Sequence, residues 1–278
     1  MAFSVLTNSG AMAALQSLNK TNSSLETTQS RINTGLAVGS TKDDSAKYTV
    51  AQTLRGDLGG LTAVTSSLNS AKSTVDVAVS GVEQISDLVN DMKSKAYEAA
   101  GVAEGDDASL EALQKDYDGL KAQIDSIVSS SEFNGVNLLA EDGGSVSSLM
   151  SLDVSSKISV SNLALDGSSG DLAAIGAGST DLGSVDAAAA MVGSLDELAD
   201  ALNDHLSTLG AASRQIEGQL TFTSSLGDVI ETGIGNLVDA DLAKESANLQ
   251  ALQVQQQLGV QALSIANQAP QSILSLFG

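Results

Sequence analysis

The residue types that perform catalysis or bind metals are few in this chain. His205 is the only histidine and cysteine is absent, so the sequence offers no Cys–His pair and no zinc cluster. Asp43-Asp44 and Asp106-Asp107 could hold a divalent cation loosely, but no EF-hand loop surrounds either pair, which favours solvated turn residues. We therefore expect a protein that is not an enzyme and that carries no cofactor and no metal.

Long helices are what the sequence provides instead. Between Leu61 and Ala99, apolar residues are spaced alternately three and four, which keeps one narrow seam on the same side of a helix. At about 1.5 Å per residue this helix would be on the order of 60 Å long, and so narrow a seam needs long partner helices alongside it. The seam comprises Leu61, Val64, Leu68, Ala71, Val75, Ala78, Val82, Ile85, Val89, Met92, Ala96 and Ala99.

Three further segments show the same spacing: residues 8–36, residues 108–128 and a fourth segment that starts near Val185. His205 lies on the seam of the fourth segment, so we expect a satisfied interfacial side chain there. From Ala240 onward apolar residues occupy two stripes, and such a helix must be enclosed by several neighbours. Within one chain only the first helix is available to cover it, which implies copies of the chain.

The helical period fails between residues 131 and 184. Lys157–Leu165 begins with alternating apolar residues and predicts one strand of a hairpin or small sheet. Residues 37–60 contain four glycines and are expected to form a connector that holds a short helical piece. The predicted fold class is mostly α: a long antiparallel, coiled-coil-like helical rod with a small β-hairpin region.

Charge is distributed unevenly along the chain. The net charge is −21, which argues against nucleic acid as a partner because phosphate binding needs a basic surface. Residues 1–100 carry 8 basic and 9 acidic residues, residues 241–278 carry 1 and 2, and residues 101–240 carry 4 and 23. The nearly neutral ends can therefore be desolvated against copies of themselves, whereas the acidic middle should face water.

Nothing in the sequence indicates a signal peptide or a membrane span. Met1–Asn19 holds no continuous apolar block with a cleavage site, and no run of 18 apolar residues occurs. We expect no membrane insertion. The chain is then cytoplasmic, or it leaves the cell by a route that does not read such a signal.

Both ends of the chain carry distinctive sequence motifs. Near the N-terminus these are Arg31-Ile32-Asn33-Thr34-Gly35-Leu36 and Lys42-Asp43-Asp44-Ser45-Ala46, followed later by Phe133-Asn134-Gly135-Val136-Asn137-Leu138-Leu139. Near the C-terminus they are Asp239-Ala240-Asp241, Ala266-Asn267-Gln268-Ala269-Pro270-Gln271 and Ile273-Leu274-Ser275-Leu276. These motifs resemble those of bacterial flagellin, and they bracket roughly residues 1–140 and 185–278 in that family's order.

The resemblance implies a layered subunit of the flagellar filament, which serves motility. Residues 1–40 and 239–278 would be core helices of the inner filament layer, which are largely unstructured in the free monomer. Residues 41–140 and 185–238 would form rod helices, and residues 141–184 a short Gly/Ser-rich outer segment without large outer domains. The family further implies an extracellular filament reached by flagellar type III export, without a cleaved signal.

The partners implied by the resemblance are copies of the chain itself, in a helical homopolymer that can also mix with other flagellins. They further include the export apparatus, an export chaperone, the filament cap and the hook–filament junction proteins. The seams of the first and last helices would carry self-assembly, with Asn22 and Gln29 setting the register. The assembly residues are Leu15, Leu18, Asn22, Leu25, Gln29, Ile32, Leu249, Leu252, Leu258, Leu263, Ile265, Ile273 and Leu274.

One departure from the family concerns recognition by the innate immune receptor of vertebrates. That receptor reads flagellins at a basic motif on the second helix and at an acidic partner on the third. Gln84 stands here where arginine is expected, and Gln123 stands at the acidic position. Since both charges are missing, we expect weak activation of the receptor.

Two alternative functions stay open at the level of sequence. A hook–filament junction protein of the same superfamily would have similar terminal helices. A secreted or cytoplasmic coiled-coil scaffold would instead be a stable, fully helical monomer or dimer.

Overall fold

The computed structural model describes residues 7–165, 171–175 and 182–277, and in these it contains five α-helices, one 3-10 turn and one hairpin. The chain divides into two compact units. The terminal unit comprises Met1–Leu58 with Val229–Gly278, and the central unit comprises Gly59–Asp228. This agrees with the predicted fold class, which is mostly α with a small antiparallel hairpin.

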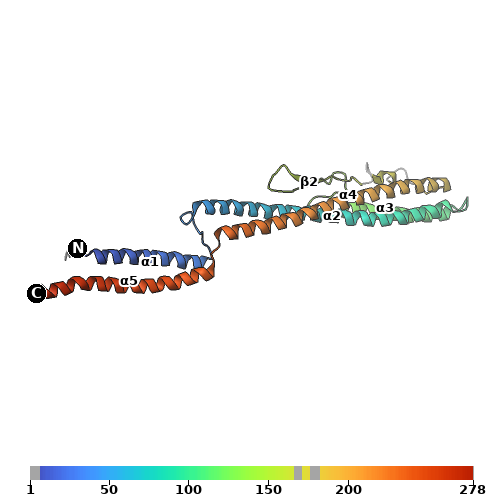
Figure 1. Cartoon of the computed structure of the whole chain (residues 1–278). Helices are drawn as coiled ribbons and strands as arrows, with labels where there is room; N and C mark the ends of the chain where they lie inside the picture. The colour runs from blue at the N-terminus through green and yellow to red at the C-terminus, as the bar shows by residue number, and fades with distance from the viewer. Residues whose placement is uncertain (1–6, 166–170, 176–181, 278) are drawn as a thin grey trace. The chain divides into compact units, whose positions relative to one another are not determined.

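The terminal unit is built around two antiparallel helices, α1 (Ser9–Thr34) and α5 (Leu242–Phe277), which lie side by side (Figure 1). The side chain of Asn8 caps α1 by accepting from the backbone N–H of Ala11 at 3.1 Å. Gly35 ends α1 in the left-handed conformation, with φ of 74°, and donates to the carbonyl oxygen of Arg31 at 2.8 Å.

A short hydrogen-bonded junction completes the terminal unit. The carbonyl oxygen of Val238 accepts from the N–H groups of Ala37 and Val38, and Gly35 accepts from Ala240 at 2.8 Å. Beside these bonds, Val38 packs with Ala51, Ile234 and Val238 in a small apolar cluster. The helix α4 (Val185–Val238) therefore ends at Val238, and α5 begins separately at Leu242.

The helix that contains the apolar ladder is longer than the sequence suggested. The predicted connector over residues 37–60 holds not a short helical piece but the start of α2, which runs without interruption from Ser45 to Ala100. Its start is fixed by Asp44, whose carboxylate accepts from the N–H groups of Ala46 and Lys47, both at 3.1 Å. Glycine disfavours helix by only about 1 kcal/mol per residue, and tertiary packing overrides that preference.

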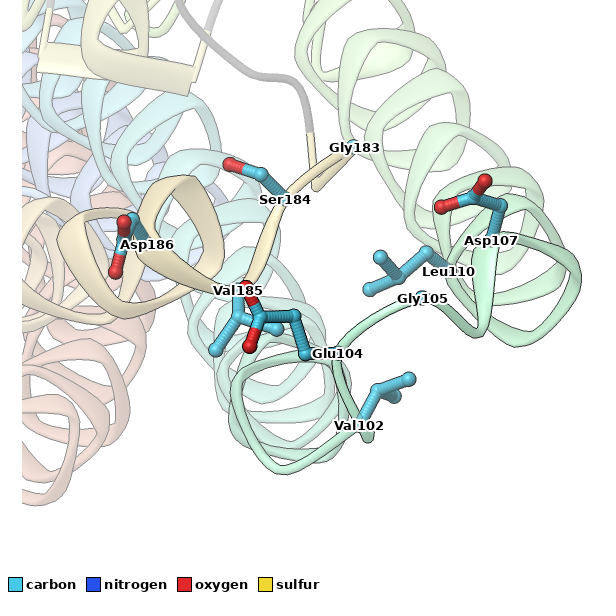
Figure 2. A pocket seen from close by; sticks show the side chains of 9 residues that line it. All are labelled: Val102, Glu104, Gly105, Asp107, Leu110, Gly183, Ser184, Val185 and Asp186. Carbon is cyan, nitrogen blue, oxygen red and sulfur yellow. The ribbon is translucent and has the colours of Figure 1, made fainter.

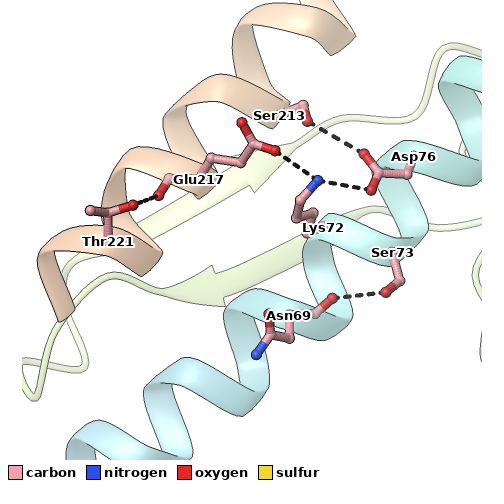
Figure 3. A network of polar contacts seen from close by, with 7 residues as sticks. All are labelled: Asn69, Lys72, Ser73, Asp76, Ser213, Glu217 and Thr221. Carbon is pink, nitrogen blue, oxygen red and sulfur yellow. Dashed lines mark hydrogen bonds and ion pairs between the residues drawn. The ribbon is translucent and has the colours of Figure 1, made fainter. Parts of the chain in front are cut away.

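The central unit buries the ladder against α3 (Asp107–Ser130) and α4 (Val185–Val238). None of the twelve ladder residues is more than 4% exposed, which confirms the predicted seam. Polar contacts also join α2 to α4 (Figure 3): Lys72 Nζ lies 2.9 Å from Glu217 and 3.0 Å from Asp76. These carboxylates, Glu217 first, raise the pKa of Lys72.

The hairpin consists of β1 (Val146–Leu149) and β2 (Lys157–Val160), which pair antiparallel with Val146 opposite Val160. The strand predicted over Lys157–Leu165 ends at Val160. Beyond it, Leu163 and Leu165 donate backbone hydrogen bonds to Leu138 and Leu139. The strand β1, with its sequence Val-Ser-Ser-Leu, was not foreseen.

No helix in the described part of the chain is long and apolar enough to cross a membrane.

Candidate functional site

The paired terminal helices hold most of the residues that the sequence assigned to assembly. On α1, Leu18, Asn22, Leu25 and Ile32 are partly buried, and Thr28 is fully buried. Leu15 and Gln29, predicted on the same seam, are exposed. The face of α1 that meets α5 is therefore rotated slightly from the predicted seam.

The same division holds on α5. Leu249, Leu252 and Leu263 are partly buried, whereas Leu258 and Ile265 are exposed. Ile273 and Leu274 lie within α5, but their side chains fall outside the described residues. The helix is thus apolar on two sides, and α1 covers one of them.

Several large apolar side chains remain uncovered on this helix pair. Met12 is 67% exposed and Ile265 is 68% exposed. Large exposed apolar patches on soluble proteins mark surfaces that bind other proteins. Among the side chains that the structure describes, the exposed large apolar residues of α1 and α5 are Met12, Leu15, Leu242, Val254, Leu258, Val260 and Ile265.

Among the described residues, three polar contacts join the terminal helix pair. Asn8 Nδ2 donates to the carbonyl oxygen of Ala266 at 2.7 Å. Gln256 Nε2 donates to Asn22 Oδ1, also at 2.7 Å, so Asn22 has a partner across the helix pair.

The third contact is an ion pair between Arg31 Nη1 and Glu245 Oε1 at 3.3 Å. Sequence reasoning missed Arg31 and Glu245 as a pair. Glu245 stands between Leu242 and Leu249 on an apolar stripe, which was an available signal, whereas Arg31 lies beside the predicted seam of the first helix and gave none.

The adjacent carboxylates considered for cation binding serve helix starts and turns. Asp43 accepts from Gly39 and from the Ser40 hydroxyl and N–H, and these bonds, the hydroxyl first, lower the pKa of Asp43. Asp106 caps α3, and its bonds to the Ser109 side chain and backbone lower its pKa. Within the described residues, no group of three or more His, Cys, Asp or Glu side chains is arranged to hold a metal ion.

His205 has a specific partner, as expected for an interfacial side chain. Its Nε2 lies 2.6 Å from Asp171 Oδ2, in the 3-10 turn η1 (Asp171–Ile175). The contact between these two side chains joins η1 to α4, so His205 has a role in packing.

A pocket of about 450 Å³ opens where the loop after α2 meets the start of α4 (Figure 2). Its carboxylates, from Glu104, Asp107 and Asp186, lie near the N-terminal ends of α3 and α4, where the helix dipoles favour negative charge. The lining residues are Val102, Glu104, Gly105, Asp107, Leu110, Gly183, Ser184, Val185 and Asp186.

The two positions connected with immune recognition are both on the surface of the central unit. Gln84, on α2, is exposed and donates from Nε2 to the carbonyl oxygen of Ser80 at 3.1 Å. Gln123, on α3, is exposed as well.

Long helices packed along one another, with an exposed apolar surface on the terminal pair, define a structural protein of the long-helix class. Two family models match this chain: the bacterial flagellin N-terminal helical region over residues 5–143 and the bacterial flagellin C-terminal helical region over residues 192–277. The chain belongs to the bacterial flagellin family, and it is a structural subunit of the flagellar filament.

Similarity to individual flagellins extends over the whole chain. Flagellin FljM of Caulobacter vibrioides is 43% identical over 275 residues, which cover 99% of this chain and 98% of that protein. A flagellin of Brucella melitensis is 39% identical and covers 99% of both chains. The crystal structure of Bacillus cereus flagellin matches with a TM-score of 0.49 and 21% identity, over 55% of this chain and 86% of that one.

Proposed function

We propose that the chain polymerises through the uncovered faces of α1 and α5. The observation that carries this proposal is the set of exposed apolar side chains on a helix pair that is itself nearly neutral. The terminal unit has 6 basic and 8 acidic residues, whereas the central unit has 7 and 26. A nearly neutral apolar surface loses little electrostatic free energy when it is desolvated against another copy.

In this proposal the assembly residues have two different tasks. Leu18, Asn22, Leu25, Ile32, Leu249, Leu252 and Leu263 hold the two helices together, while Leu15, Gln29, Leu258 and Ile265 contact neighbouring subunits, and Ile273 and Leu274 extend the same helix. Contacts of this kind are head-to-tail and do not close into a ring, so they generate a helical filament. Burial of apolar surface in the polymer offsets the entropy lost when the ends become ordered.

The remaining parts of the proposal follow from family membership. Residues 1–40 and 239–278 form the inner layer of the filament, residues 41–140 and 185–238 form rod helices, and residues 141–184 form the outer segment. Of that segment, residues 166–170 and 176–181 lie outside the described residues. The chain is exported by the flagellar type III apparatus with the help of an export chaperone, meets the filament cap and the hook–filament junction proteins, and has no enzymatic activity.

A truncation tests the central claim. Deletion of Ala240–Gly278 removes α5, and we expect the remaining chain to stay soluble but to fail to polymerise. Seeded growth, followed by light scattering and electron microscopy, measures this directly. Growth of the truncated chain into filaments would refute the proposal.

A single substitution tests the uncovered face more finely. Ile265→Asp places a charge on α5 where the side chain is 68% exposed, so it should leave the monomer folded and block seeded growth. Val154→Asp is the matched control, because Val154 is 69% exposed and lies in the hairpin loop of the central unit. Equal loss of polymerisation in both variants would contradict a specific role for α5.

A further inference from the structure

The polar contacts between α1 and α5 all agree on one antiparallel register. The pairs are Asn8 with Ala266, Asn22 with Gln256, and Arg31 with Glu245. In each pair the two residue numbers add up to between 274 and 278. The contact between the Leu18 side chain and Gly259 fits the same register, because these two residue numbers also add up to a value in this range.

The apolar residues alone do not select this register. A slip of seven residues restores nearly the same helical face, so apolar positions again meet apolar positions. Such a slip would bring Leu18 opposite Leu252 or Ala266 in place of Gly259, and small or leucine side chains fit either arrangement.

The ion pair does distinguish the registers. After a slip of seven residues, Arg31 would lie opposite Val238 or Leu252, and Glu245 would lie opposite Ser24 or Val38. Glu245 is only 8% exposed, so a slipped register would leave its charge buried without a cationic partner.

The geometry of the Arg31–Glu245 ion pair indicates that the pair specifies the register more than it stabilises the helix pair. Arg31 Nε and Glu245 Oε2 are buried and have no hydrogen-bond partner among the described residues, so desolvation of the pair is incompletely compensated. Arg31 lies in the last turn of α1 and Glu245 in the first turn of α5, where the helix dipoles favour these signs of charge. The orientation of the pair is therefore defined as well as its position.

We propose that Arg31 and Glu245 are the charged side chains that determine the register of the terminal helix pair, together with the backbone bonds of the junction, an inference that rests on the proposed self-assembly function. They act by making a slip of seven residues in either direction bury an unpaired charge. Asn22–Gln256 and Asn8–Ala266 reinforce the same register with neutral hydrogen bonds, whose loss is less costly than burial of the Glu245 carboxylate without a cationic partner.

Engineered cysteines report the register directly, because the chain contains no cysteine of its own. A Cβ atom built on Gly259 lies 3.8 Å from the Cβ of Leu18, which matches the spacing in disulfides. Leu18→Cys with Gly259→Cys therefore reports the native register. Leu18→Cys with Ala266→Cys, or with Leu252→Cys, reports the two slipped registers.

The test compares these reporters in full-length chains that are grown from filament seeds and then oxidised. With Arg31 and Glu245 intact, we expect the cross-link within one chain to form only at the native pair. In Arg31→Leu/Glu245→Leu chains the ratio of slipped to native cross-link should rise by at least about tenfold, because the penalty on slipping is removed. Arg31→Glu/Glu245→Arg should reverse most of this rise, although its charges oppose the helix dipoles.

The matched control is Glu111→Leu/Lys115→Leu, which removes an exposed ion pair from α3 and should leave the ratio unchanged. The proposal is overturned if the apolar variant cross-links only at the native pair, or if the charge-swapped variant fails to enter filaments or to restore the native cross-link. If the parent chain itself does not polymerise, the proposed function fails. The register proposal then fails with it, whereas a wrong cross-link ratio in chains that do polymerise counts against the register alone.

Discussion

Three buried polar atoms lack a partner in the described residues, and they locate the points where single side chains limit stability or specificity. They are Arg31 Nε, Tyr117 Oη and Glu245 Oε2. Arg31 and Glu245 belong to the terminal helix pair, where an uncompensated charge specifies register. Tyr117 lies in the core of the central unit with 0% exposure. Its unpaired hydroxyl therefore lowers the stability of the folded chain without specifying a register as Arg31 and Glu245 do.

Replacement of this tyrosine should stabilise the central unit. Tyr117→Phe removes the unpaired hydroxyl and keeps the ring, so we expect the free energy of unfolding to rise by about 1 kcal/mol. Chemical denaturation followed by circular dichroism measures the change. A loss of stability would show that the hydroxyl has a partner, such as a bound water.

The burial of Tyr117 also predicts that the folded chain loses stability at alkaline pH. Burial, and secondarily the charge of Asp118, raises the pKa of Tyr117 above its usual value of 10.0. As pH rises, the Tyr117 hydroxyl therefore loses its proton in the unfolded chain before it does so in the folded chain. The free energy of unfolding then falls as pH rises above about 10, by at most about 1.4 kcal/mol per pH unit. Tyr117→Phe should flatten this part of the stability curve between about pH 9 and about pH 11.

Two other single residues concern recognition by the host. The exposed amides of Gln84 and Gln123 stand where charges are expected from the resemblance to other flagellins. We expect Gln84→Arg/Gln123→Glu to raise activation of the innate immune receptor by at least about tenfold over the unmodified chain in a reporter-cell assay. Strong activation by the unmodified monomer would contradict the expectation.

At the scale of elements, α2 is the part of the molecule around which the central unit is packed. Its ladder faces α3, α4 and the segment that includes Leu138 and Leu139. Gly81 lies at a close approach of this kind, because a Cβ atom there would be 2.6 Å from Ser131 Oγ and 2.7 Å from Leu139 Cδ1. Both neighbours are buried, and the Ser131 hydroxyl donates to the carbonyl oxygen of Ile127.

Substitution by alanine should therefore have opposite effects on the free energy of unfolding at two helical glycines. Gly81→Ala overpacks the contact and should lower the free energy of unfolding by about 1–3 kcal/mol. Gly119→Ala on α3 meets nothing within 4 Å and should raise it by about 1 kcal/mol, because alanine favours helix. Thermal melts of both variants measure the difference, and equal shifts would argue against close packing at Gly81.

At the scale of the whole molecule, the uneven charge governs association. The central unit has 26 acidic and 7 basic residues, so copies brought together in a polymer repel one another. The screening length falls from about 10 Å at 0.1 M salt to about 3 Å at 1 M. Higher salt should thus favour polymerisation by weakening this repulsion.

Salt titration tests this directly. We expect the critical concentration for seeded growth to fall as sodium chloride rises from about 0.05 M to about 0.5 M. Replacement of three exposed carboxylates by amides, in Asp125→Asn/Glu197→Gln/Asp204→Asn, should make growth less dependent on salt. An unchanged salt dependence in this variant would show that charge on the central unit does not control assembly.

The sequence by itself determined the long helices, the buried ladder and the family. Spacing of three and four fixes which side of a helix is apolar, so Leu61 to Ala99 could be placed in a core without coordinates. It also indicated the carboxylate pairs as turn residues and His205 as an interfacial side chain.

Only the tertiary structure decided where α2 begins, which side of α1 meets α5, and that Arg31 pairs with Glu245. Glycine-rich residues 37–60 resemble a loop locally, yet the Asp44 cap and packing around Ala51 hold residues from Ser45 onward in a helix. Arg31 and Glu245 are 214 residues apart, and periodicity within one helix carries no information about which residue of a distant helix lies opposite. That choice is made by desolvation and pairing across the interface, which exist only once the two helices meet.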